Sequence, residues 1–227
     1  MIVSRSYADG AVMSPMLAEK PPVINAQRRQ SDRPRLDPID AAEYETFGNA
    51  ETRNGLQARV EVPLLLRALR LPLGGRVLEI GCGRGVALPV LAKGLLPREL
   101  MGVDIDASLL EVAEARLRSA RVCATLVEAD IRDLPIESNS FDIVIDFGTC
   151  YHVSGGEEGA RSALCEVARV LCPGGLFVHE TPVAQHLAHP VRSFGRTLPW
   201  ASVPLLARNR AAVLWGVRRK VTIRSIA

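Results

Sequence analysis

The sequence predicts an α/β fold: a doubly wound, mostly parallel sheet with helices on both faces. Three observations predict it. Short apolar runs alternate with helical patterns between residues 75 and 180, as in repeated strand–helix–strand units. The run Phe141 to Ile145 is apolar apart from Asp142, which is typical of a strand buried on both faces. The run Arg76 to Ile80 leads directly into a glycine-rich turn, as the first strand of such a sheet does.

The elements are expected in a regular order along the chain. A helical stretch covers about 40–70, and Pro63 suits a first helical turn because it lacks an N–H donor. Strands are expected at 76–80, 100–104, 124–128, 141–145 and 176–180, with helices at 86–93, from about 108, and at 159–171. Ser108 and Glu111 have the spacing of a capping box. The buried face of that helix is expected to comprise Leu109, Val112, Ala113 and Leu117.

We divide the 227 residues into four segments. Residues 1–38 are expected to be a disordered or extended N-terminal tail, because prolines interrupt them and no helical or strand period persists. Residues 39–72 form a helical cap, residues 73–182 the α/β core, and residues 183–227 a basic, apolar C-terminal segment. This length fits one core domain with appendages.

Charge is distributed unevenly along the chain. From Thr181 onward there are eight basic residues and no acidic one, whereas the preceding residues carry 20 basic and 25 acidic groups. Such a segment suits anionic lipid, nucleic acid or an anionic substrate. A solvated basic face, or one paired with acidic residues elsewhere in the fold, is the structural alternative. Aromatic residues make up only 4%, which argues against a stacking platform for single-stranded nucleic acid.

Cysteine and hydropathy patterns bear on location. The five cysteines are scattered, with no CxxC pair and no histidine at ligand spacing, so we expect a reducing compartment and no metal site. No apolar run is long enough for a transmembrane helix, and the N-terminus has no apolar signal core. We therefore expect a cytoplasmic protein, with peripheral membrane contact through the basic C-terminal segment as a further hypothesis.

The run Val77 to Gly85 is the most informative part of the chain. Its glycines are spaced G-x-G-x-G, and glycine permits a sharp turn and close approach of a ligand to the backbone. A dinucleotide fingerprint would need a third glycine at position 86, where Val86 stands. An NAD-dependent dehydrogenase is therefore the weakest interpretation. Glu79 would repel a pyrophosphate but suits a cationic or amino-bearing ligand.

This segment resembles motif I of the class I S-adenosyl-L-methionine (SAM) dependent methyltransferases. Val103–Asp106 resembles the acidic end of the family's second strand, and Glu128–Pro135 resembles its adenine-contacting segment. Ser140–Asp146 resembles its fourth strand, and Arg169–Phe177 resembles the turn into its fifth strand. Within the family the pattern is closest to the small-molecule, quinone-methyltransferase-like "type 11" branch. The resemblance implies a Rossmann-like fold in which residues 73–182 bind SAM. It also implies methyl transfer to a small-molecule acceptor, apolar or quinone- or lipid-like.

The resemblance implies a cofactor site at the first two strand ends. Gly81 and Gly83 would let the backbone approach the methionine part of SAM, and Glu79 would support that loop and the cofactor amino group indirectly. Asp104 would accept hydrogen bonds from the ribose hydroxyls. Ile105, its neighbour, belongs to the same cofactor-binding set. Asp106 is interpreted as a helix cap rather than a ligand.

Further positions follow the third and fourth strands. The resemblance implies that Asp130 accepts from the adenine amino group and that Ile131 donates its backbone N–H to a ring nitrogen. Asp146 and Phe147 would line the boundary between cofactor and acceptor.

Tyr151 and His152 are the candidate catalytic residues, because family members often carry histidine at this place. A histidine near the acceptor could take its proton as the methyl group is transferred. The alternative is that His152 only hydrogen-bonds the loop and fixes its shape.

The end of the chain departs from the family pattern. The resemblance implies two more strands in an antiparallel hairpin, but only Val221 to Ile226 alternates like a strand. We therefore expect a hairpin that is incomplete, or that a partner completes, and an unpaired sheet edge would favour a homodimer. A non-catalytic or partner-dependent SAM-binding domain is the alternative function. Nucleic-acid methylation is disfavoured, because no N/D-P-P-Y/F motif follows the fourth strand.

Overall fold

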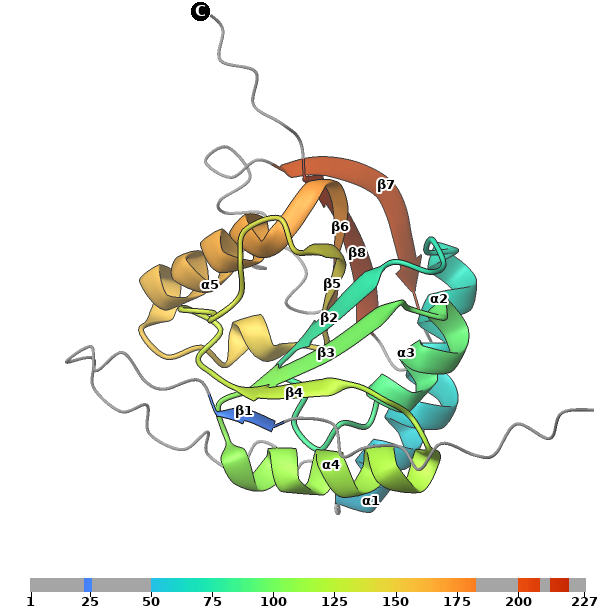
Figure 1. The fold of residues 1–227 in the computed structure, drawn as a ribbon. Helices are drawn as coiled ribbons and strands as arrows, with labels where there is room; N and C mark the ends of the chain where they lie inside the picture. The colour runs from blue at the N-terminus through green and yellow to red at the C-terminus, as the bar shows by residue number, and fades with distance from the viewer. Residues whose placement is uncertain (1–22, 26–49, 183–199, 209–212, 221–227) are drawn as a thin grey trace, which may run out of the picture.

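The fold is that of a computed structural model, which describes residues 23–25, 50–182, 200–208 and 213–220 (Figure 1). Eight strands form one sheet with the order β1-β4-β3-β2-β5-β6-β8-β7. They are β1 (Val23–Asn25), β2 (Arg76–Ile80), β3 (Glu99–Asp104), β4 (Thr125–Glu128), β5 (Phe141–Asp146), β6 (Leu171–Pro182), β7 (Trp200–Arg208) and β8 (Val213–Lys220). Strands β1 to β6 pair in parallel, and β8 is antiparallel to both of its neighbours. The predicted Rossmann-like sheet is confirmed.

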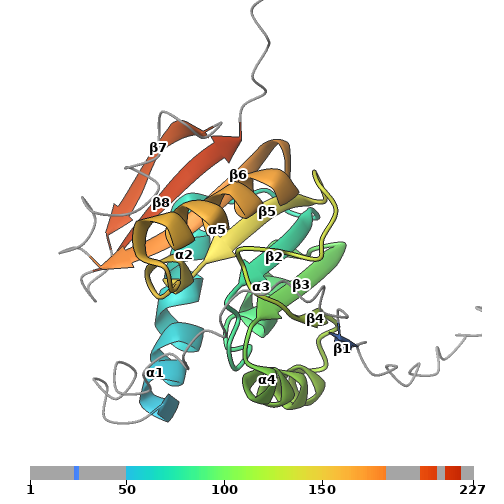
Figure 2. The same cartoon turned by 90° about the vertical axis from the view of Figure 1, so that its left-hand side faces the viewer.

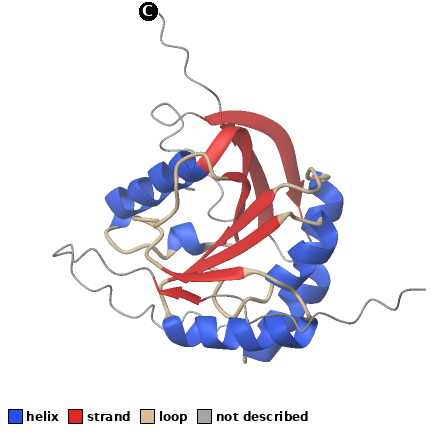
Figure 3. Cartoon of the chain, viewed as in Figure 1, coloured by secondary structure: helices blue, strands red, loops and turns tan. Residues whose placement is uncertain are grey.

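Helices cover both faces of this sheet (Figures 2 and 3). They are α1 (Ala50–Leu56), the π-helical turn η2 (Gln57–Glu61), α2 (Val62–Leu69), α3 (Leu88–Leu95), α4 (Ala107–Ala120), the 3₁₀ turn η3 (Thr149–Tyr151) and α5 (Gly156–Val170). Helices α2, α3 and α4 pack on one face and α5 on the other. In the described residues no helix is long and apolar enough to cross a bilayer.

The alternation of side chains along the central strands creates two cores. Val77 of β2 and Ile143 of β5 join the cluster under α2, α3 and α4, whereas their neighbours Leu78 and Val144 join the cluster under α5. Successive residues of a strand point to opposite faces, so a continuous apolar strand needs helices on both sides.

Most predicted elements are present, and two details of the helices differ. Pro63 lies in the first turn of α2 as expected. The N-cap of α4 is Asp106, whose Oδ1 accepts from Ser108 N and Leu109 N at 2.8 and 3.3 Å, so the predicted capping box from Ser108 is wrong. The buried face of α4 is Leu110, Ala113 and Leu117, and Val112 is 41% exposed.

The prediction of an incomplete hairpin is also wrong. Strand β8 pairs with β6 from Leu176↔Arg219 to Pro182↔Val213, and β7 pairs with β8. The register of β7 shifts between Val203 and Ala207, around Pro204, because proline cannot donate to the ladder. The strand expected over Val221–Ile226 lies outside the described residues. Within the described residues the sheet therefore ends at β7 rather than at β6, and a homodimer through the sheet edge stays a prediction. Strand β1 lies within the predicted tail and pairs with β4.

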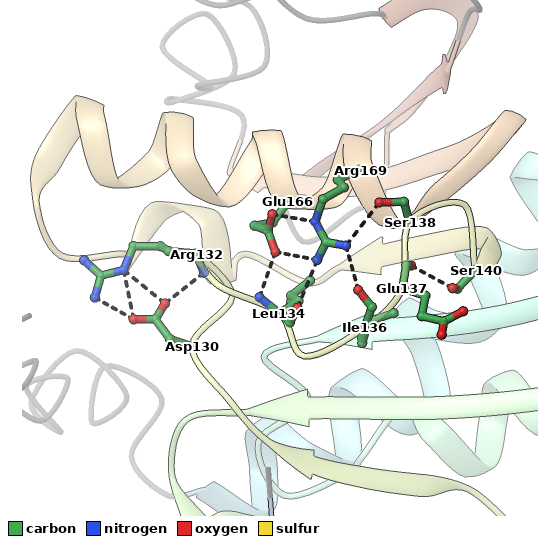
Figure 4. Close-up of polar contacts among 9 residues, drawn as sticks. All are labelled: Asp130, Arg132, Leu134, Ile136, Glu137, Ser138, Ser140, Glu166 and Arg169. Atoms are coloured by element: carbon green, nitrogen blue, oxygen red, sulfur yellow. Dashed lines mark hydrogen bonds and ion pairs between the residues drawn. The ribbon is translucent and has the colours of Figure 1, made fainter. Parts of the chain in front are cut away.

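The connection from β4 to β5 contains no helix and is held on α5 by side chains (Figure 4). Leu134 N donates to Glu166 Oε2 at 2.8 Å. Arg169 donates to Leu134 O at 2.9 Å and to Ile136 O at 2.6 Å, and it pairs with Glu166 at 2.7 Å. These bonds satisfy backbone groups that a helix would otherwise satisfy internally.

Candidate functional site

Three carboxyl groups meet at the carboxyl ends of β2, β3 and β5. They belong to Glu79, Asp104 and Asp146, and the parallel registers bring their strand ends together. The strand order reverses here, since the chain passes from β2 to β3 on one side and later returns to β5 on the other. Open α/β sheets bind ligands at this switch point. Within the described residues none of the three forms an ion pair with a basic side chain.

Glu79 is the least satisfied of these groups. The residue is 2% exposed, and its Oε2 has no hydrogen-bond partner among the described residues. Burial raises the pKa of Glu79 well above its ordinary value, and the charges of Asp104 and Asp146 raise it further. A buried carboxyl in this position is costly unless a cation or a donor reaches it.

Asp104 connects the glycine turn to the start of α4. Its Oδ2 accepts from Gly83 N at 2.7 Å and its Oδ1 from Asp106 N at 3.0 Å. Burial raises the pKa of Asp104, and these two backbone N–H groups lower it in part. Ile105 is exposed beside it. Asp104, the residue predicted to bind the ribose, therefore lies at the glycine turn, and Ile105 lies on the surface.

The glycines of the turn have different surroundings. Gly81 and Gly83 have φ angles of +62° and +50°, which favour glycine. A Cβ at Gly81 would collide with the side chain of Thr149, whereas a Cβ at Gly83 would meet nothing closer than Asp104 Oδ2 at 4.0 Å. Gly81 thus permits close packing between two loops, and Gly83 leaves open space beside the backbone.

Asp146, predicted to line the boundary between cofactor and acceptor, is fully buried, and its own loop binds its side chain. Its carboxylate accepts from the backbone N–H groups of Gly148, Thr149 and Cys150 at 2.9, 2.6 and 3.4 Å. It therefore caps η3. Phe147 is half-buried and packs against the cluster under α2, α3 and α4.

Thr149 is a residue of the site that sequence reasoning missed. Its Oγ1 donates to Ile80 O at 3.2 Å, and its side chain occupies the space that a Cβ at Gly81 would need. Thr149 therefore joins the loop after β5 to the glycine turn after β2. The available signal is the spacing Asp146-x-x-Thr149, because aspartate at a strand end often accepts from backbone groups two and three residues on.

The turn predicted to contact adenine follows β4, and the candidate catalytic pair follows β5. Asp130 is bound by Arg132, whose Nη2 lies 2.6 Å from Asp130 Oδ2. Ile131 is buried. Tyr151 ends η3, and His152 follows it, exposed, with its backbone N donating to Thr149 O at 2.9 Å.

Comparison with known proteins identifies the family. The family described as "Methyltransferase domain", type 11, matches residues 78–179. EEF1A lysine methyltransferase 4 of Mus musculus is 32% identical over 190 residues, covering 77% of this chain and 68% of that protein. Phthiotriol/phenolphthiotriol dimycocerosates methyltransferase of Mycobacterium tuberculosis is 34% identical over 113 residues, covering 48% of this chain and 39% of that protein.

A solved structure of a SAM-dependent methyltransferase from Aquifex aeolicus shares the fold. Its TM-score is 0.63 at 13% identity, covering 81% of this chain and 100% of that chain. The chain spans less than half the length of several curated relatives that it matches. Because the similarity to the mouse protein extends over two thirds of its length, and the family match spans the strands that build the site, the chain belongs to the class I SAM-dependent methyltransferases, in their type 11 branch.

Proposed function

We propose that this chain transfers the methyl group of SAM to a small-molecule acceptor. The observation that carries the proposal is the buried Glu79 carboxyl, with Oε2 lacking a hydrogen-bond partner in the described residues. Asp104 and Asp146 add negative charge to the same strand ends. A site of this kind favours a cationic ligand, and the sulfonium and ammonium groups of SAM fit it.

The neighbouring residues fit the nucleoside part. Each oxygen of Asp104 accepts one backbone N–H, so each keeps acceptor capacity for a ribose hydroxyl. The open space beside Gly83 admits a ligand next to the backbone. We propose Asp130 and the Ile131 N–H for the adenine ring, and exposed Ile105 as an apolar contact at the rim.

The chain's own residues have three tasks. When bound, SAM supplies a methyl group that its sulfonium charge has already activated. The protein must align the acceptor, exclude water and, for an oxygen or carbon acceptor, take up a proton. Alignment alone contributes roughly 7–11 kcal/mol in well-oriented model reactions. We propose that Tyr151, the last residue of η3, and His152, which follows it, serve the acceptor side.

For the acceptor we propose an apolar, quinone- or lipid-like small molecule. The names of the relatives point to different acceptors: one names phthiotriol and phenolphthiotriol dimycocerosates, and another names a lysine of EEF1A. A partner-dependent SAM-binding domain is the alternative. Peripheral membrane contact through residues 183–227 is a further proposal, and salt-dependent pelleting with anionic vesicles tests it.

Calorimetry with SAM, S-adenosylhomocysteine and NAD tests the cofactor site. We expect binding of the first two and none of NAD. Incubation with labelled SAM and cell extract, separated into small-molecule, protein and nucleic-acid fractions, then tests the acceptor class. Label in the small-molecule fraction supports the proposal, and label in protein alone contradicts it. Binding without methyl consumption would favour the partner-dependent alternative.

The variant His152→Ala tests the acceptor side. If His152 takes the acceptor proton, turnover falls by about a hundredfold or more, while the affinity for SAM stays unchanged. Steady-state rates and calorimetry on the same samples separate the two effects. Full turnover in the variant would make His152 a structural residue of its loop.

A further inference from the structure

Two arginines hold the helix-free connection between β4 and β5, and they bind different partners (Figure 4). Arg169, on α5, donates to the carbonyl oxygens of Leu134 and Ile136. Arg132 belongs to the connection itself and binds Asp130, at the end nearer the strand carboxyl edge. The first arginine holds backbone, and the second holds the carboxylate proposed to contact the adenine ring.

The contact between Arg132 and Asp130 is geometrically well defined. Nε lies 3.0 Å from Oδ1 and 2.9 Å from Oδ2, Nη2 lies 2.6 Å from Oδ2, and the Arg132 backbone N lies 2.9 Å from Oδ1. The side chains are 15% and 27% exposed, so water screens the pair only in part. A guanidinium that contacts both oxygens fixes the plane of a carboxylate, which the point charge of a lysine cannot do.

Arg132 also reaches a second loop. Its Nη1 lies 3.3 Å from both the carbonyl oxygen and the Oγ of Ser154. Ser154 stands two residues after His152, in the segment that leads into α5. One side chain therefore connects the turn after β4 with the loop after η3.

We propose that Arg132 is a positioning residue of the SAM site. It holds the Asp130 carboxylate in one orientation, and it joins the adenine turn to the loop that carries His152. The inference rests on the proposed function, because it takes Asp130 as a cofactor contact. A carboxylate already held in place loses less side-chain entropy when a ligand binds, so Arg132 contributes to affinity without touching the ligand.

Calorimetry with SAM and S-adenosylhomocysteine on the full chain tests this role, together with amide hydrogen exchange without ligand. Arg132→Ala should weaken both affinities by about tenfold, and Arg132→Lys should restore only part of the loss. The double variant Arg132→Ala/Asp130→Ala should bind no more weakly than Asp130→Ala alone, because Arg132 acts through Asp130. Exchange should rise in Arg132→Ala at residues 130–133 and 153–156 together.

Arg169→Ala is the matched control, since it releases the other end of the same connection. It should lower the unfolding temperature and leave ligand affinity unchanged. The variant Arg118→Ala, on the exposed side of α4, should also leave ligand affinity unchanged. Unchanged affinity in Arg132→Ala, an equal loss in Arg169→Ala, or additive losses in the double variant would each overturn the positioning role. Wild-type protein that binds neither ligand would instead overturn the proposed function, and the positioning role with it.

Discussion

Glu79 and Asp146 are buried acids at adjacent strand ends, and they differ in how far the protein satisfies their carboxyl oxygens. Asp146 pairs in register with Ile80, one residue after Glu79. The carboxylate of Asp146 accepts from three backbone N–H groups of its own loop. Glu79 keeps an oxygen without a partner in the described residues. Burial raises the pKa of both groups, but only for Asp146 do local hydrogen bonds lower it again.

The difference separates structural from ligand-directed acids. A buried carboxylate whose acceptor sites are filled by backbone is already paired and stabilises its loop. A buried carboxyl that the protein leaves partly unsatisfied is costly, and a bound cation or donor would offset that cost. Burial and strand position alone do not distinguish the two, and the hydrogen-bond partners do.

Asp146→Ala should have the largest effect on folding. It leaves three backbone N–H groups around η3 without their acceptor, so we expect a loss of about 3 kcal/mol or more in the free energy of unfolding. Chemical denaturation measures it. Glu111→Ala, on the exposed side of α4, is the control and should change stability little. If Asp146→Ala lost as little stability as Glu111→Ala, Asp146 would not be a structural acid, and the contrast with Glu79 would fail.

Glu79→Gln should affect ligand binding rather than stability. The affinity for SAM should fall by about ten- to a hundredfold, because a charge-assisted contact contributes about 1.5–3 kcal/mol. Stability without ligand should stay equal or rise, since a neutral amide avoids the cost of burying a charge. Calorimetry and denaturation on the same variant check both. A variant as unstable as Asp146→Ala would show that Glu79 is structural too.

The pH dependence of stability sharpens the same contrast. The folded-state pKa of Glu79 is raised above its ordinary value of 4.5, so the folded protein binds this proton more tightly than the unfolded chain. The contribution of Glu79 to stability is therefore present below pH 4.5 and is lost as pH rises through the folded pKa. Glu79→Gln should remove this part of the slope in ligand-free protein. An unchanged slope, measured by denaturation across pH, would contradict the assignment.

Thr149→Val should have the smallest effect. It keeps the shape of the side chain against Gly81 but removes the hydrogen bond to Ile80 O, so we expect a loss of about 1 kcal/mol in stability. Thr149→Ser keeps the hydroxyl and serves as the control. Because the hydroxyl joins the two loops, the affinity for SAM should weaken in the valine variant and less so in the serine variant. A serine variant that loses as much stability and affinity as the valine variant would show that the methyl contact with Gly81 matters as much as the hydrogen bond.

Local sequence patterns allowed much of the fold and part of the candidate site to be predicted. The strand at Arg76–Ile80, the glycine turn after it and the cap at Asp106 each depend on residues close together in the chain. The hydrogen bonds of Asp146 with its own loop were not predicted, because a strand-end carboxylate looks the same in sequence whether a ligand or its own loop satisfies it. Strand β8 was missed because its pairing with β6 joins distant segments and shows no clear alternation.

The sequence by itself determined the order of strands and helices, the doubly wound sheet and the acidic residues at the strand ends. These follow from apolar periodicity and from turn chemistry, which act over a few residues. Only the tertiary structure decided which buried acid has its oxygens filled by backbone N–H groups. It also decided that Thr149 packs on Gly81 and that Arg132 connects Asp130 with Ser154. The bonds of Thr149 with Ile80 and of Arg132 with Ser154 join residues 69 and 22 positions apart, so packing of the whole sheet rather than local propensity brings these partners together. The bonds that satisfy Asp146 are local, but the burial of both acids depends on the assembled sheet.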